Sequence, residues 1–87
     1  MPDLFNLNIY TPQGVLYSSS AKRITALNSL GKFGVLPGHT IFASDIVNGE
    51  MQVLNDSGEE VVFEVGDGLI SVDADNVTVA LESGKKK

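Results

Sequence analysis

The residues that could do chemistry are few, and His39 comes first because it is the only histidine in the chain. Ser44 and Asp45 follow it closely, so a Ser-His-Asp arrangement, in which the imidazole takes the serine proton, can be drawn. The sequence around Ser44 does not resemble the strained turn that exposes such a nucleophile. A metal site of the usual imidazole kind needs more than one such ligand. We therefore predict no catalytic and no metal-binding residue, and interpret His39 as either a turn-stabilising side chain or a contact residue.

The acidic residues offer two other kinds of chemistry, acid–base catalysis by paired carboxylates and calcium binding. Glu59 is followed directly by Glu60, and Asp73 lies two positions before Asp75. The stretch that begins at Asp73 lacks the ligand number and the trailing glutamate of a calcium loop. Gly66-Asp67-Gly68 precedes no helical pattern that could hold a phosphate, and it indicates a bulge or bend within a strand. We expect turn-forming and solubilising residues, and no cofactor.

Length and composition indicate a single small domain. The chain has 87 residues and no cysteine, so disulfides and thiolate chemistry are excluded. It contains no apolar run near the roughly 20 residues that span a bilayer. The first residues lack the basic and apolar regions of a secretory signal. We expect a soluble cytoplasmic protein.

Charge is distributed unevenly along the chain. The net charge is −5, with one acidic residue in residues 1–44 and ten in residues 45–84. An acidic body repels phosphate backbones, so we expect no nucleic-acid partner. The acidic residues 45–84 either form a solvated face that keeps the protein soluble, or they face water while residues 1–44 contact partners. The basic residues 85–87 are predicted to be a disordered tail after a single domain over residues 1–84.

Apolar and polar residues alternate along the chain, and no long segment keeps helical spacing. Phe5, Leu7 and Ile9 alternate with polar side chains, which is typical of a half-buried strand. Asn55 to Gly58, between two apolar runs, is the clearest hairpin signal. The predicted strands cover residues 5–10, 15–17, 21–27, 33–36, 51–54, 60–65, 69–72 and 77–82, with a loop at 18–20. The fold class is all-β, an antiparallel β-sandwich or flattened barrel of about ten short strands.

Residues 31–39, Gly-Lys-Phe-Gly-Val-Leu-Pro-Gly-His, carry the most information. Glycines at this spacing mark positive φ or a close approach of another surface, and Pro37-Gly38 is typical of a turn. We interpret the segment as a shaped protrusion between strands, with His39 near its tip, that docks onto a partner.

In order and spacing, four motifs together resemble the epsilon subunit of F-type ATP synthase across essentially the whole chain. They are Thr11-Pro12-Gln13-Gly14, residues 31–39, Gly66-Asp67-Gly68-Leu69 with Val72, and Asn76-Val77-Thr78-Val79. The resemblance implies a non-catalytic β-sandwich in the central stalk of the rotor. Such a domain packs beside the gamma subunit, sits on the polar loops of the membrane-embedded ring of c subunits (the c-ring), and couples ring rotation to the catalytic head.

The resemblance also implies roles for particular residues. Contacts with the c-ring are assigned to Lys32, Phe33 and His39, and contacts with gamma to Thr11, Phe42 and Ser44. Thr11 is alternatively a turn residue, and Phe42 alternatively a core residue. At Lys32 the family often carries an acid, and at Ile41 proline is common, so an ionic contact and the turn geometry are both in question.

The common bacterial form continues into a helical hairpin that can bind ATP and inhibit the ATPase. This sequence ends at Lys87, where that hairpin would begin, so we expect a naturally short form without nucleotide binding, peripheral on the cytoplasmic face of the cell membrane. Two other functions stay open. A carbohydrate-binding module would expose aromatic platforms, but the chain has no tryptophan and two tyrosines. The second of these alternatives is a small hydrolase.

Overall fold

The computed structural model describes residues 4–38 and 41–87, which form nine strands and no helix. The strands are β1 (Phe5–Thr11), β2 (Gly14–Asn28), β3 (Gly31–Val35), β4 (Phe42–Ile46), β5 (Gly49–Asn55), β6 (Glu60–Val65), β7 (Gly68–Asp73), β8 (Asn76–Leu81) and β9 (Gly84–Lys86). None of the described segments is a helix that could cross a membrane. His39 lies outside the described residues, and its predicted role stays a prediction.

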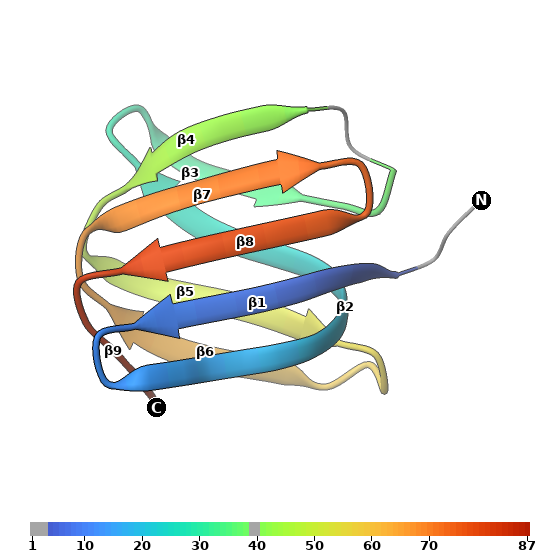
Figure 1. The fold of residues 1–87 in the computed structure, drawn as a ribbon, viewed down its shortest axis with the longest axis horizontal. Helices are drawn as coiled ribbons and strands as arrows, with labels where there is room; N and C mark the ends of the chain where they lie inside the picture. Colours follow the sequence, from blue (N-terminus) through green and yellow to red (C-terminus); the bar gives the residue numbers. More distant parts are fainter. Residues whose placement is uncertain (1–3, 39–40) are drawn as a thin grey trace.

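All the strands belong to one hydrogen-bonded sheet that curls over on itself. The strand order is β4-β7-β8-β1-β2-β5-β6-β9, and β3 pairs with β2 along the edge opposite to β5. Figure 1 shows β4, β7, β8 and β1 in front of β3, β5, β6 and β9. The predicted β-sandwich is therefore confirmed, with one difference: β1 and β8 run parallel, whereas the pattern favoured antiparallel neighbours throughout.

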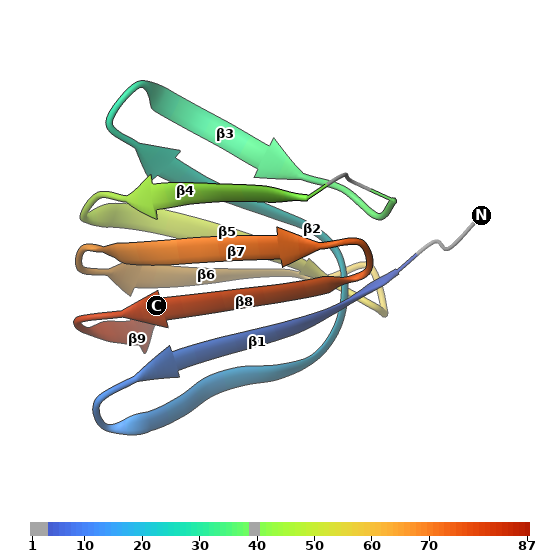
Figure 2. The same ribbon diagram turned by 45° about the horizontal axis from the view of Figure 1, so that its top comes forward.

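Strand β2 joins the two layers. Its first half pairs with β1, from Gly14 opposite Thr11 to Ala21 opposite Phe5. Its second half pairs with β5 and β3 instead, and the register with β5 shifts between Ala21 and Arg23. Such an irregularity bends a strand and increases its twist. The bend carries β2 from the front layer to the back one (Figure 2).

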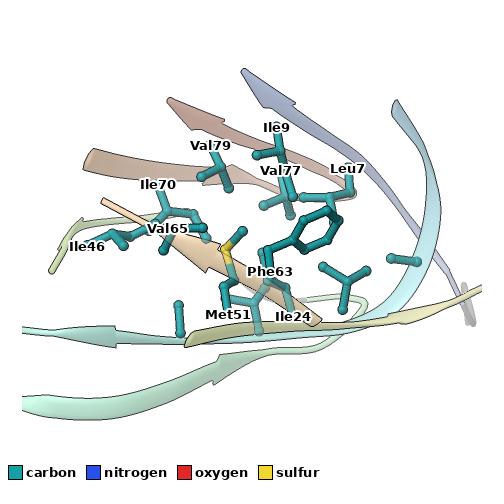
Figure 3. Packing of buried hydrophobic residues seen from close by; sticks show 14 of the residues in the cluster. Leu7, Ile9, Ile24, Ile46, Met51, Phe63, Val65, Ile70, Val77 and Val79 are labelled. Atoms are coloured by element: carbon teal, nitrogen blue, oxygen red, sulfur yellow. The ribbon is translucent and has the colours of Figure 1, made fainter. Parts of the chain in front are cut away.

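The core lies between the layers and is built from the inward members of each alternating strand. Phe5, Leu7 and Ile9 are each 2% exposed or less, as the alternation predicts. Met51 and Phe63 of the other layer point toward Ile70, Val77 and Val79 (Figure 3). Tyr17 packs edge-on against Phe63, and burial raises the pKa of its hydroxyl. No buried side-chain polar atom in the described part of the chain lacks a hydrogen-bond partner.

Two predicted irregular segments are strands. Residues 18–20 form a loop in the prediction but belong to β2, because Asn6, Asn8 and Leu7 of β1 pair with all three serines. Residues 85–87 are not a disordered tail. Gly84 to Lys86 form β9 along β6, the Lys87 amide donates to the Val62 carbonyl, and Lys87 Nζ lies 3.0 Å from a Glu50 carboxylate oxygen.

Two glycine-rich segments also differ from the prediction. Gly66 and Asp67 do not form a bulge within one strand, because they connect β6 of the back layer to β7 of the front layer. Within residues 31–38 the predicted protrusion is mostly strand, in line with the strand predicted over 33–36. Gly31–Val35 is strand β3, which pairs with β2. Lys32 therefore lies near the turn of the β2–β3 hairpin, and Leu36 lies beyond the other end of the strand.

Candidate functional site

The candidate site lies on the outer side of the front layer, where the outward members of four strands come into register. Val15 of β2 is opposite Tyr10 of β1, Tyr10 is opposite Ala80 of β8, and Ala80 is opposite Leu69 of β7. Strands in a sheet lie roughly 4.8 Å apart, so these four side chains form a line about 14 Å long. We call this line the apolar row.

The apolar row is exposed to solvent. Val15 is 60% exposed, Tyr10 42% and Leu69 65%. Single exposed apolar residues are ordinary on a soluble protein, whereas a contiguous set marks an interaction surface. The folding of the strands does not require these side chains to be apolar, because the core contacts come from the alternate positions.

The next rows on this face are polar but uncharged. Asn8 lies between Ser18 and Thr78, and Thr78 is opposite Ser71. Ser18 Oγ donates a hydrogen bond of 2.8 Å to Asn8 Oδ1, so these polar groups are already paired within the sheet. Further along, the Asn6 and Asn76 side chains are bonded to each other at 3.3 Å.

Among the described residues, charged side chains enter this face only at its margin. Asp45 of β4 is opposite Leu69, at one end of the apolar row, and Asp73 is the last residue of β7. The polar side chains in the middle of the face are hydrogen-bonded to one another, and no charged side chain of the described residues lies among them. This composition fits a protein surface that is largely uncharged.

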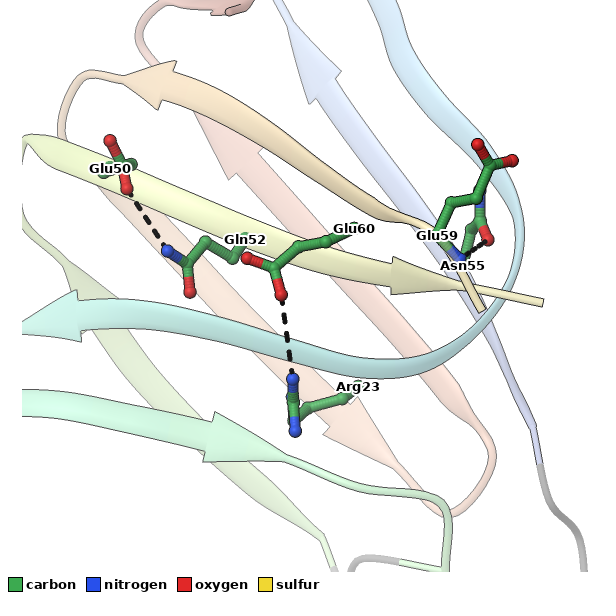
Figure 4. Close-up of polar contacts among 6 residues, drawn as sticks. All are labelled: Arg23, Glu50, Gln52, Asn55, Glu59 and Glu60. Atoms are coloured by element: carbon green, nitrogen blue, oxygen red, sulfur yellow. Dashed lines mark hydrogen bonds and ion pairs between the residues drawn. The ribbon is translucent and has the colours of Figure 1, made fainter. Parts of the chain in front are cut away.

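The back layer has the opposite character. Arg23 and Glu60 form an exposed ion pair at 3.9 Å, and Gln52 donates to Glu50 at 3.2 Å (Figure 4). Lys87 also donates to Glu50, and this hydrogen bond, with that from Gln52, holds the pKa of the Glu50 carboxyl below its ordinary value. A surface of mixed exposed charges is typical of a face that stays in water.

The three residues predicted to contact gamma lie at the rim of the front layer and face inward. Thr11 Oγ1 accepts from the Gln13 amide and donates to the Gly14 carbonyl, as the turn interpretation expects. Phe42 packs against the core and has its ring centroid 5.9 Å from that of Phe33. Ser44 Oγ accepts a hydrogen bond of 3.1 Å from the Asn28 side chain.

These positions nevertheless border the apolar row. Thr11 follows Tyr10 on β1, and Ser44 precedes Asp45, which is opposite Leu69. Thr11 therefore lies next to Tyr10, within the row, and Ser44 lies next to its Leu69 end, each with an inward side chain, and the outward residues of the row are not among the predicted contacts. The alternation of apolar and polar residues predicts which side chains of β1 and β8 point outward, but it does not predict the register in which the two strands pair.

The residues predicted to contact the c-ring are less closely grouped. Lys32 is exposed next to the β2–β3 hairpin, and Phe33 is half-buried against Phe42. Beyond the far end of β3, Leu36 and Ile41 are 57% and 82% exposed. They flank the segment that contains His39, which lies outside the described residues.

The acidic side chains of the described ranges do not gather into a metal-binding cluster. Residues 4–38 and 41–87 contain no group of three histidine, cysteine or acidic side chains that could hold a metal ion. Glu59 and Glu60 take separate partners, since the Glu59 amide donates to Asn55 and the Glu60 carboxylate pairs with Arg23. An open hollow of about 560 Å³ near Gly66 and Ser83 is bordered by Glu64 and Lys85, a cross-strand pair of β6 and β9.

Comparison with known proteins places the chain in a family. The family model of the ATP synthase delta/epsilon chain, β-sandwich domain, matches residues 4–86. The ATP synthase epsilon chain of Wolinella succinogenes is 38% identical over 79 residues, which are 91% of this chain and 60% of that one. The epsilon chain of Desulfosudis oleivorans is 32% identical over 87 residues, covering all of this chain and 65% of its own length. The chain thus spans about three fifths of these relatives.

Solved structures share the fold at low sequence identity. A chain in the OSCP/F1/c-ring structure of the Euglena gracilis mitochondrial ATP synthase superposes with a TM-score of 0.92 at 18% identity, covering 99% of this chain and 55% of that one. A chain in the central stalk/c-ring structure from Tetrahymena thermophila gives a TM-score of 0.74 at 14% identity, covering 92% and 64%. With the match over residues 4–86, the chain belongs to the family of the ATP synthase delta/epsilon chain β-sandwich domain.

Proposed function

We propose that this chain is a non-catalytic central-stalk subunit of an F-type ATP synthase, peripheral to the membrane, and that its front face binds the gamma subunit. The observation that carries the proposal is the apolar row, since an uncharged, rigid sheet face suits a permanent contact between rotating subunits. Family membership and relatives named ATP synthase epsilon chain support a partner within the ATP synthase, and gamma is our proposal among its subunits.

The proposal assigns the coupling role to shape and rigidity. The front face is part of a continuous sheet, so little conformational entropy is lost when a partner covers it. Tyr10 and Leu69 are the large side chains of the apolar row and serve as its anchors. Thr11 and Ser44, which border the row beside Tyr10 and beside Asp45, are its proposed boundary. Lys32, Phe33 and His39 are proposed to contact the c-ring.

The test is binding to the gamma subunit of the same organism, measured by calorimetry with folded variants. Leu69→Arg and Tyr10→Arg place a charge in the apolar row at outward positions, so the fold is retained while the interface must bury an unpaired charge. We expect each to weaken binding at least about tenfold.

Val62→Arg is the matched control, because Val62 is an outward strand residue of the back layer. It should bind as the unchanged protein does. Wild-type affinity in the two row variants, or a loss confined to Val62→Arg, would assign the gamma contact to another face. Absence of binding by the unchanged, folded chain would overturn the proposed function itself.

A further inference from the structure

The seam between β3 and β4 is closed without a strand ladder. In the described part of the chain β3 pairs only with β2, and β4 only with β7. These two strands are therefore the free edges of the back and front layers where the layers meet. Three kinds of contact join them: the ring centroids of Phe33 and Phe42 lie 5.9 Å apart, the Val47 amide donates to the Leu27 carbonyl at 3.0 Å, and side-chain hydrogen bonds hold the tip of the β2–β3 hairpin.

Asp45 holds the turn of the hairpin itself. Its carboxylate accepts a hydrogen bond of 3.0 Å from the Ser29 amide and a second, at 3.4 Å, from the Ser29 hydroxyl. Ser29 is the first of the two residues between β2 and β3. The neighbouring Asn28 side chain donates to Ser44 Oγ at 3.1 Å, and Ser44 Oγ donates to the Asp45 carbonyl at 3.0 Å.

The hairpin tip that these bonds hold presents Leu30. Its side chain is 96% exposed, and its amide donates to Asn28 Oδ1 at 2.9 Å. Gly31 follows with φ of +127°, a conformation that favours glycine. The exposure of one leucine is ordinary on a soluble protein, but this leucine lies on a firmly held turn, so a partner can bury it at little entropic cost.

We infer that Asp45 is a positioning residue that fixes the β2–β3 hairpin to β4, so that Leu30 and Lys32 are presented to the c-ring in a fixed place relative to the gamma-binding face. This inference rests on the proposed function. Asp45 lies where the two surfaces meet, because its backbone is opposite Leu69 of the apolar row and its carboxylate holds Ser29. The hairpin and the apolar row then move as one body.

The first test needs no partner. In Asp45→Ala the Ser29 amide loses its acceptor, and we expect its hydrogen exchange, followed by NMR, to accelerate about tenfold or more. Asp45→Asn keeps an oxygen acceptor and should protect Ser29 nearly as well as the unchanged residue. Asp73→Ala removes an outward carboxylate from the next strand and should leave Ser29 unaffected.

The second test measures function with the same variants, using purified gamma and a detergent-solubilised c-ring. Asp45→Ala should weaken binding of the gamma complex to the c-ring at least about fivefold relative to Asp45→Asn, which removes the same charge from the margin of the gamma-binding face, and the two variants should bind gamma alone equally well. Leu30→Ser, with normal Ser29 exchange, should weaken c-ring binding similarly.

Unchanged Ser29 exchange in Asp45→Ala would overturn the inference, as would faster exchange with unaltered c-ring binding. A loss of gamma binding in Asp45→Ala relative to Asp45→Asn that equals the loss of c-ring binding would also overturn it, since Asp45 would then be a direct gamma contact. If the unchanged chain binds gamma but not the c-ring, the inference fails and the gamma surface stands. If it binds neither, the proposed function fails.

Discussion

Gly68 shows how a single residue can be fixed by backbone rather than by side-chain packing. A Cβ placed there would overlap the carbonyl oxygen of Ala80 and lie 2.9 Å from the Cα of Leu81. These are backbone atoms of the neighbouring strand β8, and they cannot rotate away as a side chain would. The glycine therefore lets β7 approach β8 closely directly after the crossover from the back layer.

We predict that Gly68→Ala lowers the free energy of unfolding by about 1–3 kcal/mol, because β7 must shift away from β8. Urea unfolding followed by circular dichroism measures the change. Gly34→Ala is the control, since its Cβ would lie 3.7 Å from the nearest atom and its φ is not positive. That substitution should change stability by no more than about 0.5 kcal/mol. Equal stability of the two variants would contradict the close approach.

At the scale of elements, alternation predicts which strands form but not which strands lie side by side. The outward and inward members of β1 and β8 follow from their sequences, as Leu7 and Val77 show. The parallel pairing of these strands joins residues about seventy positions apart, and no local pattern specifies it. Because the apolar row depends on this register, only its separate members could be found in the sequence.

The mispredicted elements have a common cause in long-range pairing. The three serines at 18–20 have turn-like local preferences, but β1 supplies a complete ladder for them. The basic residues 85–87 have no preference for strand, yet β6 offers a free edge and Glu50 offers a counter-charge. Local propensity is outweighed in both places by partners that are distant in sequence.

Strand β9 gives a pH-dependent prediction at this scale. The Glu50 pKa is lowered from its ordinary 4.5 by hydrogen bonds from Lys87 and Gln52 and by the charge of Lys87. The contribution of the Glu50–Lys87 pair to folding stability is therefore fully present above pH 4.5 and is lost as the pH falls through the lowered pKa. The Lys87 pKa is raised above its ordinary 10.5 by Glu50, so the contribution is also lost as pH rises through that raised pKa.

We therefore expect Lys87→Gln to raise the titration midpoint of the Glu50 carboxyl, followed by NMR of its carboxyl carbon. Lys86→Gln, which removes a neighbouring positive charge, should raise it less. The Lys87 amide, bonded to the Val62 carbonyl, should exchange faster in Lys87→Gln if the ion pair helps to hold β9. Identical Glu50 midpoints in both variants would show that the pair does not persist in solution.

For the molecule as a whole, the main consequence of the fold is a difference between its two outer faces. The bend in β2 places the uncharged surface of β1, β7 and β8 on one side and the ion pairs of β2, β5 and β6 on the other (Figures 1 and 2). Both layers bury their inward residues in one core, so the two outer faces are held in a fixed position relative to each other. A sandwich of this kind can hold one side against a partner and keep the other in water.

This asymmetry predicts how binding to gamma depends on salt and temperature. Burial of the apolar row should give a negative heat-capacity change, and because the row carries no charge, affinity should change less than about threefold between 50 and 500 mM NaCl. Calorimetry at several temperatures measures both. The charged back layer would behave differently, since salt shortens the range of its interactions and would weaken binding about tenfold or more. Strong salt dependence that disappears in Arg23→Gln would assign the contact to the back layer, whereas salt-insensitive binding that Leu69→Arg abolishes would assign it to the apolar row.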